Sequence, residues 1–77
     1  MDEKVFLQKE NRFFSVEFRT DLFGGLNIVR TWGRIDGNYS REKIVPVSSE
    51  EEGKIVFELL ILEKVKRGFR FVDKRWR

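Results

Sequence analysis

Segment 13–20 alternates apolar and polar side chains, and this alternation constrains the fold more than any other feature of the sequence. Its apolar residues at a period of two are Phe14, Val16 and Phe18. A strand with this pattern packs one face on a core and exposes the other. The Gly24-Gly25 pair then interrupts the pattern, and segment 26–34 resumes it with β-branched residues. Because glycines permit a tight chain reversal, the region predicts two neighbouring antiparallel strands.

Segment 26–34 carries apolar side chains on both of its faces. Ile28 shares one face with Trp32, whereas Val29 lies on the opposite face. A half-buried strand usually keeps its apolar residues on one face. We therefore expect a bulge or a bend near Gly33 that reconciles the two sets.

Three shorter strand signals flank this region. Segment 4–9 alternates loosely and is expected to form a short strand. The sequence Asp36-Gly37-Asn38 is the strongest turn signal in the chain, and it precedes an expected strand over 39–47. Segment 69–72 is expected to add a final short strand.

One helix is predicted between the last two strands. Ser49 followed by Glu52 fits a capping box, and the helix should continue to about Arg67, with Gly68 as its stop. The resulting order is β-β-β-β-α-β. It predicts an α+β fold in which one helix packs across a mostly antiparallel sheet of about five strands.

The predicted helix has more apolar surface than one sheet face can cover. One stripe contains Ile55, Leu59 and Leu62, with Val56 and Leu60 beside it. A second stripe, on a different side, contains Phe57, Ile61 and Val65. The terminal strands or the 21–25 loop could cover this second stripe. Alternatively, Phe57, Ile61 and Val65 form an interface with another protein or with a second copy of the chain.

The composition argues against catalysis. The 77 residues contain neither His nor Cys, so the commonest general base, the commonest metal ligand and all thiolate chemistry are missing. No glycine-rich loop cradles a phosphate, and no carboxylate pair suggests acid–base chemistry. We therefore expect a non-enzymatic chain without a metal or cofactor. No membrane-length apolar run or signal peptide is evident, which makes the cytoplasm the expected compartment.

The positive charge is unevenly distributed. The net charge is +3, and the seven basic residues near the end of the chain are Lys64, Lys66, Arg67, Arg70, Lys74, Arg75 and Arg77. This asymmetry favours a polyanionic partner, either nucleic acid or an acidic protein surface, although a merely solvated surface is the alternative. We expect one domain over 1–73 and a basic tail at 74–77.

Segment 23–35 reads Phe-Gly-Gly-Leu-Asn-Ile-Val-Arg-Thr-Trp-Gly-Arg-Ile and resembles the signature of WGR domains. A Phe-rich strand precedes it, a turn, a strand and a Glu-rich helix start follow it, and Lys66-Arg67-Gly68-Phe69 resembles the usual ending of the family. The likeness covers roughly 11–71. The family occurs in DNA-dependent poly(ADP-ribose) polymerases and, stand-alone or fused, in bacterial proteins. The resemblance implies a binding module of the stand-alone bacterial type, without the polymerase activity.

The resemblance also implies roles for two residues of the motif. In the polymerases the Trp packs against the end of a DNA duplex, a role that would fall on Trp32. The Arg joins the DNA contact to neighbouring domains, a role that would fall on Arg34. One position departs from the family, which usually has Gly where this chain has Asp36. The turn is therefore expected to be reshaped, and the carboxylate should weaken attraction for phosphate.

The motif residues also make a physical case for a binding strip. Side chains at a period of two share a face, so Arg30, Trp32 and Arg34 line up along one strand. Arg41 and Lys43 would extend this strip if they pair across the turn. An indole can stack on a base, and a guanidinium can grip a phosphate. The candidate DNA-binding residues are Trp32, Gly33, Arg34, Arg30, Arg41 and Lys43.

A purely structural interpretation of the motif stands beside this one. Trp32 would then be a core residue, Gly33 would serve a bulge, and Arg34 would form a salt bridge with a carboxylate such as Glu17. The sequence favours DNA, at a duplex end or break, as the partner. Protein interaction or self-association through the apolar helix surface is the alternative.

Overall fold

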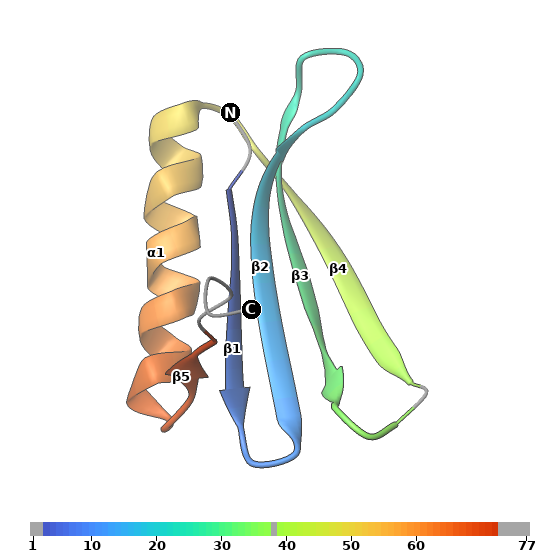
Figure 1. The fold of residues 1–77 in the computed structure, drawn as a ribbon. Coiled ribbons are helices and arrows are strands. Elements are labelled where there is room, and N and C mark those ends of the chain that lie inside the picture. Colours follow the sequence, from blue (N-terminus) through green and yellow to red (C-terminus); the bar gives the residue numbers. More distant parts are fainter. Residues whose placement is uncertain (1–2, 38, 73–77) are drawn as a thin grey trace.

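The structure, a computed structural model, describes residues 3–37 and 39–72 of the chain. Its elements are β1 (Glu3–Lys9), β2 (Arg12–Thr20), β3 (Leu26–Arg34), β4 (Ser40–Val47), α1 (Glu50–Lys66) and β5 (Arg70–Phe71). The strands form one antiparallel sheet in the order β4-β3-β2-β1-β5, and α1 lies across one face of it (Figure 1). The predicted α+β fold is confirmed. The expected tail at 74–77 lies outside the described residues.

The Phe-rich face of β2 forms the centre of the core, as predicted. Phe14, Val16 and Phe18 are 2%, 0% and 4% exposed. They cluster with buried side chains from β1, β3 and α1, namely Leu7, Ile28 and Phe57. Most of the hydrophobic stabilisation of the fold arises on this helix-facing side of the sheet. Each large apolar side chain that is buried there contributes about 1.5–3 kcal/mol to stability relative to its exposed state.

Strand β3 is regular, so the predicted bulge near Gly33 is wrong. Its pairing with β2 runs without a break from Leu26 to Arg34. Ile28 is buried on the helix-facing side, and Val29 is buried on the opposite side. The helix covers Ile28, whereas Val29 is flanked on the opposite face by the side chains that pair with it, Glu17 on β2 and Ile44 on β4. Strand β3 can therefore bury apolar residues on both of its faces without a bulge that shifts the strand register.

Both ends of α1 are capped. Ser49 Oγ accepts a hydrogen bond from the Glu52 amide at 3.0 Å, as the capping signal predicted, while the Glu52 carboxylate accepts from the Ser48 amide at 2.7 Å. At the other end, Gly68 adopts a φ of +100°, and its amide donates to Val65 while the next amide donates to the Lys64 carbonyl. This is a Schellman motif, and it turns the chain towards β5.

The rotation of α1 about its axis differs from the prediction. Gly53 and Phe57 are buried, and Val56, Leu60 and Ile61 pack against the core. The prediction that Phe57 and Ile61 lie on the surplus stripe is therefore wrong. A Cβ added to Gly53 would clash with the Phe18 ring, so the small residue allows the helix to approach the sheet on this side.

The stripe that α1 leaves in solvent is the other one. Ile55, Leu59 and Leu62 are 55%, 59% and 50% exposed. The β2–β3 loop does not cover it, because Leu22 and Phe23 at the tip of that loop are almost fully exposed themselves. Within the described residues, no helix combines the length and apolar character needed to cross a bilayer.

Candidate nucleic-acid interface

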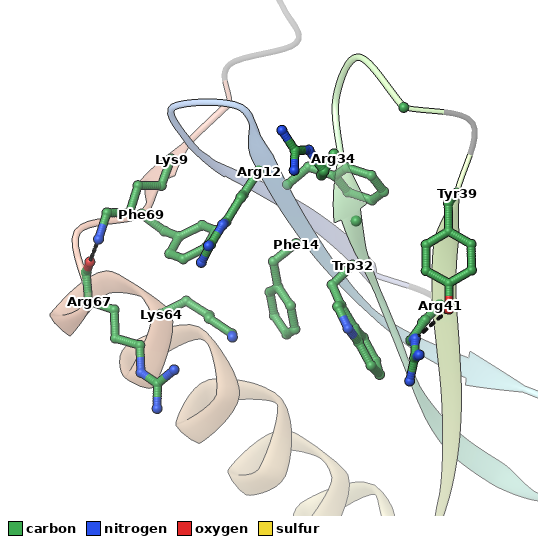
Figure 2. A pocket seen from close by; sticks show the side chains of 13 residues that line it. Lys9, Arg12, Phe14, Trp32, Arg34, Tyr39, Arg41, Lys64, Arg67 and Phe69 are labelled. Atoms are coloured by element: carbon green, nitrogen blue, oxygen red, sulfur yellow. Dashed lines mark hydrogen bonds between the residues drawn. The ribbon is translucent and has the colours of Figure 1, made fainter.

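An open groove lies between the C-terminal half of α1 and the ends of β2, β3 and β4 (Figure 2). Its volume is about 740 Å³, within the range of sites that hold drug-sized ligands. The side chains and glycines that line it are Lys9, Arg12, Phe13, Phe14, Trp32, Gly33, Arg34, Gly37, Tyr39, Arg41, Lys64, Arg67 and Phe69. We call this site the basic groove.

Strand register builds the sheet side of the basic groove. Trp32 pairs with Phe14 on one side and with Arg41 on the other, which places the three side chains in one row. Arg12 and Arg34 form the next row towards the end of the sheet. The predicted alignment of Trp32 and Arg34 with a basic residue across the turn is confirmed by this pairing.

Trp32 belongs in part to the core and in part to the groove. Its side chain packs against the buried cluster that contains Phe14 and is only partly buried, and the remaining surface faces the groove. The Arg30 guanidinium lies over the indole, with Cζ 5.6 Å from the ring centroid. A cation in this position restrains the ring. Trp32 is therefore half-buried against the core, as the structural interpretation expects, and its remaining surface is open to a ligand; its role in binding stays a prediction.

Gly33 brings β4 close to the motif. A Cβ at this position would lie 2.7 Å from the Tyr39 carbonyl oxygen and 3.1 Å from Ser40 Cα. These are backbone atoms, so any larger residue would push the two strands apart. Tyr39 in turn accepts a hydrogen bond from Arg41 Nε at 2.6 Å, and the same guanidinium lies 5.6 Å from the tyrosine ring. This contact fixes the outer wall of the groove.

The C-terminal end of α1 supplies the opposite wall. Lys64 Nζ lies 4.9 Å from the Phe14 ring centroid and 5.5 Å from that of Phe69. Burial lowers the pKa of the Lys64 ammonium below its usual value near 10.5, and repulsion from Arg67 adds to the effect. Lys9 donates from Nζ to the Arg67 carbonyl at 2.7 Å, which ties β1 to the end of the helix. In this wall, the Lys64 ammonium lies over two aromatic rings and close to a second cation, Arg67.

The charge of the basic groove is entirely positive. Six cationic side chains line it, and the described part of the chain contributes no carboxylate to its lining. Among the residues that the structure describes, only Arg34 and Arg67 of these six have carboxylate partners, Asp36 and Glu63, and both pairs are solvent-exposed. The cations therefore repel one another, and an incoming anion relieves that repulsion. The groove is therefore suited to a polyanion with an aromatic or flat apolar group.

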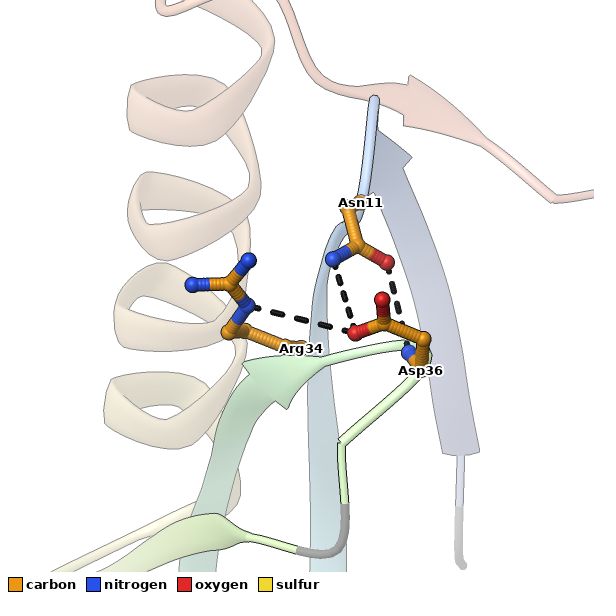
Figure 3. Close-up of polar contacts among 3 residues, drawn as sticks. All are labelled: Asn11, Arg34 and Asp36. Atoms are coloured by element: carbon orange, nitrogen blue, oxygen red, sulfur yellow. Dashed lines mark hydrogen bonds and ion pairs between the residues drawn. The ribbon is translucent and has the colours of Figure 1, made fainter.

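Asp36 is not part of the groove lining, and its side chain contacts Asn11 and Arg34 (Figure 3). Its carboxylate accepts a hydrogen bond from Asn11 Nδ2 at 2.8 Å, and its amide donates to Asn11 Oδ1 at 3.3 Å. The distance from Asp36 Oδ1 to Arg34 Nε is 4.0 Å, and both side chains are over 70% exposed. Such a pair contributes little, so the Arg34 guanidinium stays accessible. Thus Asp36 joins the two turns at this end of the sheet.

The structural alternative gave Arg34 a salt bridge with a carboxylate such as Glu17; among the described residues, the structure gives it only the long contact with Asp36, and Glu17 as the partner is wrong. Glu17 pairs with Arg19 at 2.7 Å on the face of β2 that points away from α1. Arg34 lies on the helix-facing side, because it shares the parity of Trp32 along β3. The sheet therefore separates the two groups.

The structure gathers most, but not all, of the predicted site. Trp32, Gly33, Arg34 and Arg41 line the basic groove. Arg30 and Lys43 pair with each other one row further along the same face and lie outside the lining. Sequence reasoning missed Lys9, Arg12, Tyr39, Lys64, Arg67 and the phenylalanines of the groove. The basic run near the end of the chain included two of these cations, but it gave no sign that they face Trp32.

Comparison with known proteins identifies the family. The family profile described as WGR domain matches residues 3–75, which is nearly the whole chain. No curated protein and no solved structure gives a significant match. WGR domains are nucleic-acid-binding modules rather than catalytic domains, which is consistent with a binding role for this chain.

Proposed function

The chain belongs to the WGR domain family, and we propose that it binds DNA at a duplex end or break through the basic groove. One observation carries the proposal. Six cations surround an aromatic floor, and no carboxylate from the described residues lies among them. Phosphate contacts supply most of the affinity of such sites, and aromatic faces add stacking.

The cations of the groove are placed to contact a phosphate backbone. Arg12 and Arg34 pair across β2 and β3 at one end of the groove, and Arg41 lies one row away on β4. Lys64 on α1 and Arg67 at the C-cap of this helix line the opposite wall. Arginine forks bind phosphate oxygens bidentately, whereas lysine acts as a point charge. A single strand or the terminal nucleotides of a duplex fit between these two walls.

The aromatic floor favours an end over the middle of a duplex. Inside an intact duplex every base face is stacked on its neighbours, so Trp32 has nothing flat to contact. A blunt end or a break exposes a base face. Stacking of an aromatic side chain on a base contributes about 1–3 kcal/mol. Trp32 should therefore discriminate ends from continuous duplex, while the cations bind both.

Competition binding tests this proposal. A fluorescently labelled blunt duplex is bound by the protein, and unlabelled blunt, nicked and covalently closed circular duplexes of the same sequence compete for it. We expect the blunt and nicked molecules to compete well and the closed circle to compete poorly. Equal competition by the closed circle would show general backbone binding, and no binding to any of them at low salt would refute the proposal.

A pair of variants separates the groove from the overall charge. Arg34→Ala removes one groove cation, and Lys54→Ala removes an exposed cation on α1 that lies outside the groove lining. Both lower the net charge equally. We expect the slope of log Kd against log salt to fall by about 0.9 for Arg34→Ala alone. Equal slopes for the two variants would contradict a contact at Arg34.

A further inference from the structure

The outward face of α1 carries a continuous seam that nothing in the described chain covers. The seam consists of Glu51, Ile55, Leu59, Leu62 and Lys66. Residues at these spacings of three and four share one face of a helix. The three apolar members are at least half exposed. The core lies on the opposite side of the helix, at Gly53 and Phe57.

The seam is acidic at one end and basic at the other. Glu51 lies in the first turn of α1 and Lys66 in the last. Among the described residues, the ion pairs are Arg19–Glu17, Arg34–Asp36 and Arg67–Glu63. Neither end of the seam is therefore paired within that part of the chain. A surface that matches the seam must be apolar in its middle. It must also place a basic group opposite Glu51 and an acidic group opposite Lys66.

A second copy of the same helix, running in the opposite direction, has this order of charge. We propose that the chain forms an antiparallel, two-fold symmetric dimer through the outer seam of α1. With the two-fold axis between positions 58 and 59, Ile55 faces Leu62 of the second copy, and Glu51 faces Lys66 of the second copy. The two Leu59 side chains meet beside the axis. Such an interface is closed, so it gives a dimer and no filament.

Charge selects this arrangement over its parallel counterpart. In a parallel pair, Glu51 would face Glu51 and Lys66 would face Lys66, which destabilises association. The antiparallel pair also opposes the two helix dipoles. One contact limits its strength, because Glu58 approaches its own copy near the two-fold axis. The dimer is therefore a weak one, in the class of interfaces that bury less than about 1,200 Å².

Dimerisation leaves the basic groove open. The α1 residue at the centre of the groove wall, Lys64, points towards the sheet and lies over Phe14. The seam is on the other side of the helix. The dimer is therefore independent of the proposed DNA binding, and its test needs no DNA.

Sedimentation velocity at increasing protein concentration tests the proposal. The wild type should approach twice its mass of 9.3 kDa at concentrations of hundreds of micromolar. Leu59→Lys should remain a monomer with unchanged circular dichroism, because Leu59 is 59% exposed. Leu22→Lys is the matched control, since it replaces a leucine that is 98% exposed at the far loop tip. It should dimerise like the wild type.

A charge exchange identifies the partner as a second copy. Glu51→Lys and Lys66→Glu should each be monomeric, because each places like charges at both ends of the seam. An equimolar mixture of the two should dimerise, because every end then meets its opposite. Glu58→Gln should lower the dimer Kd. A wild type that stays monomeric to about 1 mM, or a dimer unaffected by Leu59→Lys, would overturn the proposal.

Discussion

The helix-facing side of β2, β3 and β4 has two halves that differ although they share the same strands. In one half, Phe18, Ile28 and Val45 form a row of apolar side chains beneath the first turns of α1. In the other half, the row contains Trp32 and Arg41 and is open to solvent as the basic groove. We call them the apolar half and the basic half.

The helix residue above each half accounts for the difference. Gly53 lies above the apolar half and lets the helix backbone approach Phe18 within contact distance. Lys64 lies above the basic half, and its long side chain fills the space over Phe14. Gly53 near the start of α1 thus closes one half, whereas Lys64 near its end leaves the other half open. One sheet face can thus carry both a packed core and an open cationic groove.

Filling the close contact in the apolar half should have the largest effect. Gly53→Ala places a methyl group against the Phe18 ring. Overpacking of this kind costs about 1–3 kcal/mol, more than the roughly 1 kcal/mol that alanine gains in helix propensity. Gly53→Leu should cost about 3 kcal/mol or more. Urea unfolding followed by circular dichroism measures both changes. The neighbouring variant Lys54→Leu should stay within about 0.5 kcal/mol of the wild type, because Lys54 is exposed.

Removing the aromatic face from the basic half should have the next largest effect. Trp32→Leu keeps apolar bulk against the core but cannot stack on a base. We expect DNA-end affinity to fall by about 1–3 kcal/mol, or roughly 5- to 150-fold. Fluorescence anisotropy with a blunt duplex measures it. Trp32→Phe retains a ring and should lose less. If Trp32→Leu bound ends as tightly as the wild type while remaining folded, stacking by Trp32 would be ruled out.

Removing the charge of Lys64 should change stability and binding in opposite directions. Lys64→Met keeps the length of the side chain, relieves repulsion from Arg67 and needs no desolvation of a charge. We expect a higher Tm. We also expect the slope of log Kd for DNA against log salt concentration to be smaller by about 0.9. Lys54→Met is the control and should change neither. A lower Tm for Lys64→Met would show that its contacts with Phe14 and Phe69 outweigh the repulsion.

The pH dependence should follow from the same group. The folded state lowers the pKa of Lys64, so the unfolded chain binds more protons between that pKa and 10.5. Stability arising from this group therefore increases as pH rises through that window. Phosphate beside the ammonium raises its pKa again, so DNA binding should take up protons and weaken over the same window. Anisotropy titrations at several alkaline pH values check this, and Lys64→Met should abolish that part of the dependence.

Neutralising Asp36 should have the smallest effect. Asp36→Asn keeps an oxygen that accepts from Asn11 and removes a charge near Arg34. Exposed charges interact by about 0.2–1 kcal/mol, so DNA affinity should rise by a factor of roughly 1.5 to 5. Glu42→Gln gives the same change in net charge on the opposite face of the sheet, where it should have almost no effect. An equal gain for both variants would indicate net charge alone.

Local pattern was sufficient for most of the elements. The period of two predicted the buried face of β2, and Ser49 predicted the start of α1, because these signals act between residues close in sequence. Side chains alternate between the two faces of a strand, so Trp32 and Arg34 were predicted to share one face of β3. The turn after β3 predicted that Arg41 lies beside them on the next strand. The bulge at Gly33 was predicted wrongly, since burial of β3 on both faces depends on strands that flank it from elsewhere in the chain.

The sequence by itself determined the order of elements, the family and the strip that contains the Trp32-Gly33-Arg34 motif. The tertiary structure decided which side of α1 meets the sheet, and therefore that Phe57 is core while Ile55, Leu59 and Leu62 are exposed. It also placed Lys64 and Arg67 opposite Trp32. The physical reason is that periodicity orients side chains within one element only. The fit of Gly53 against Phe18, two residues far apart in the chain, sets how the elements face each other.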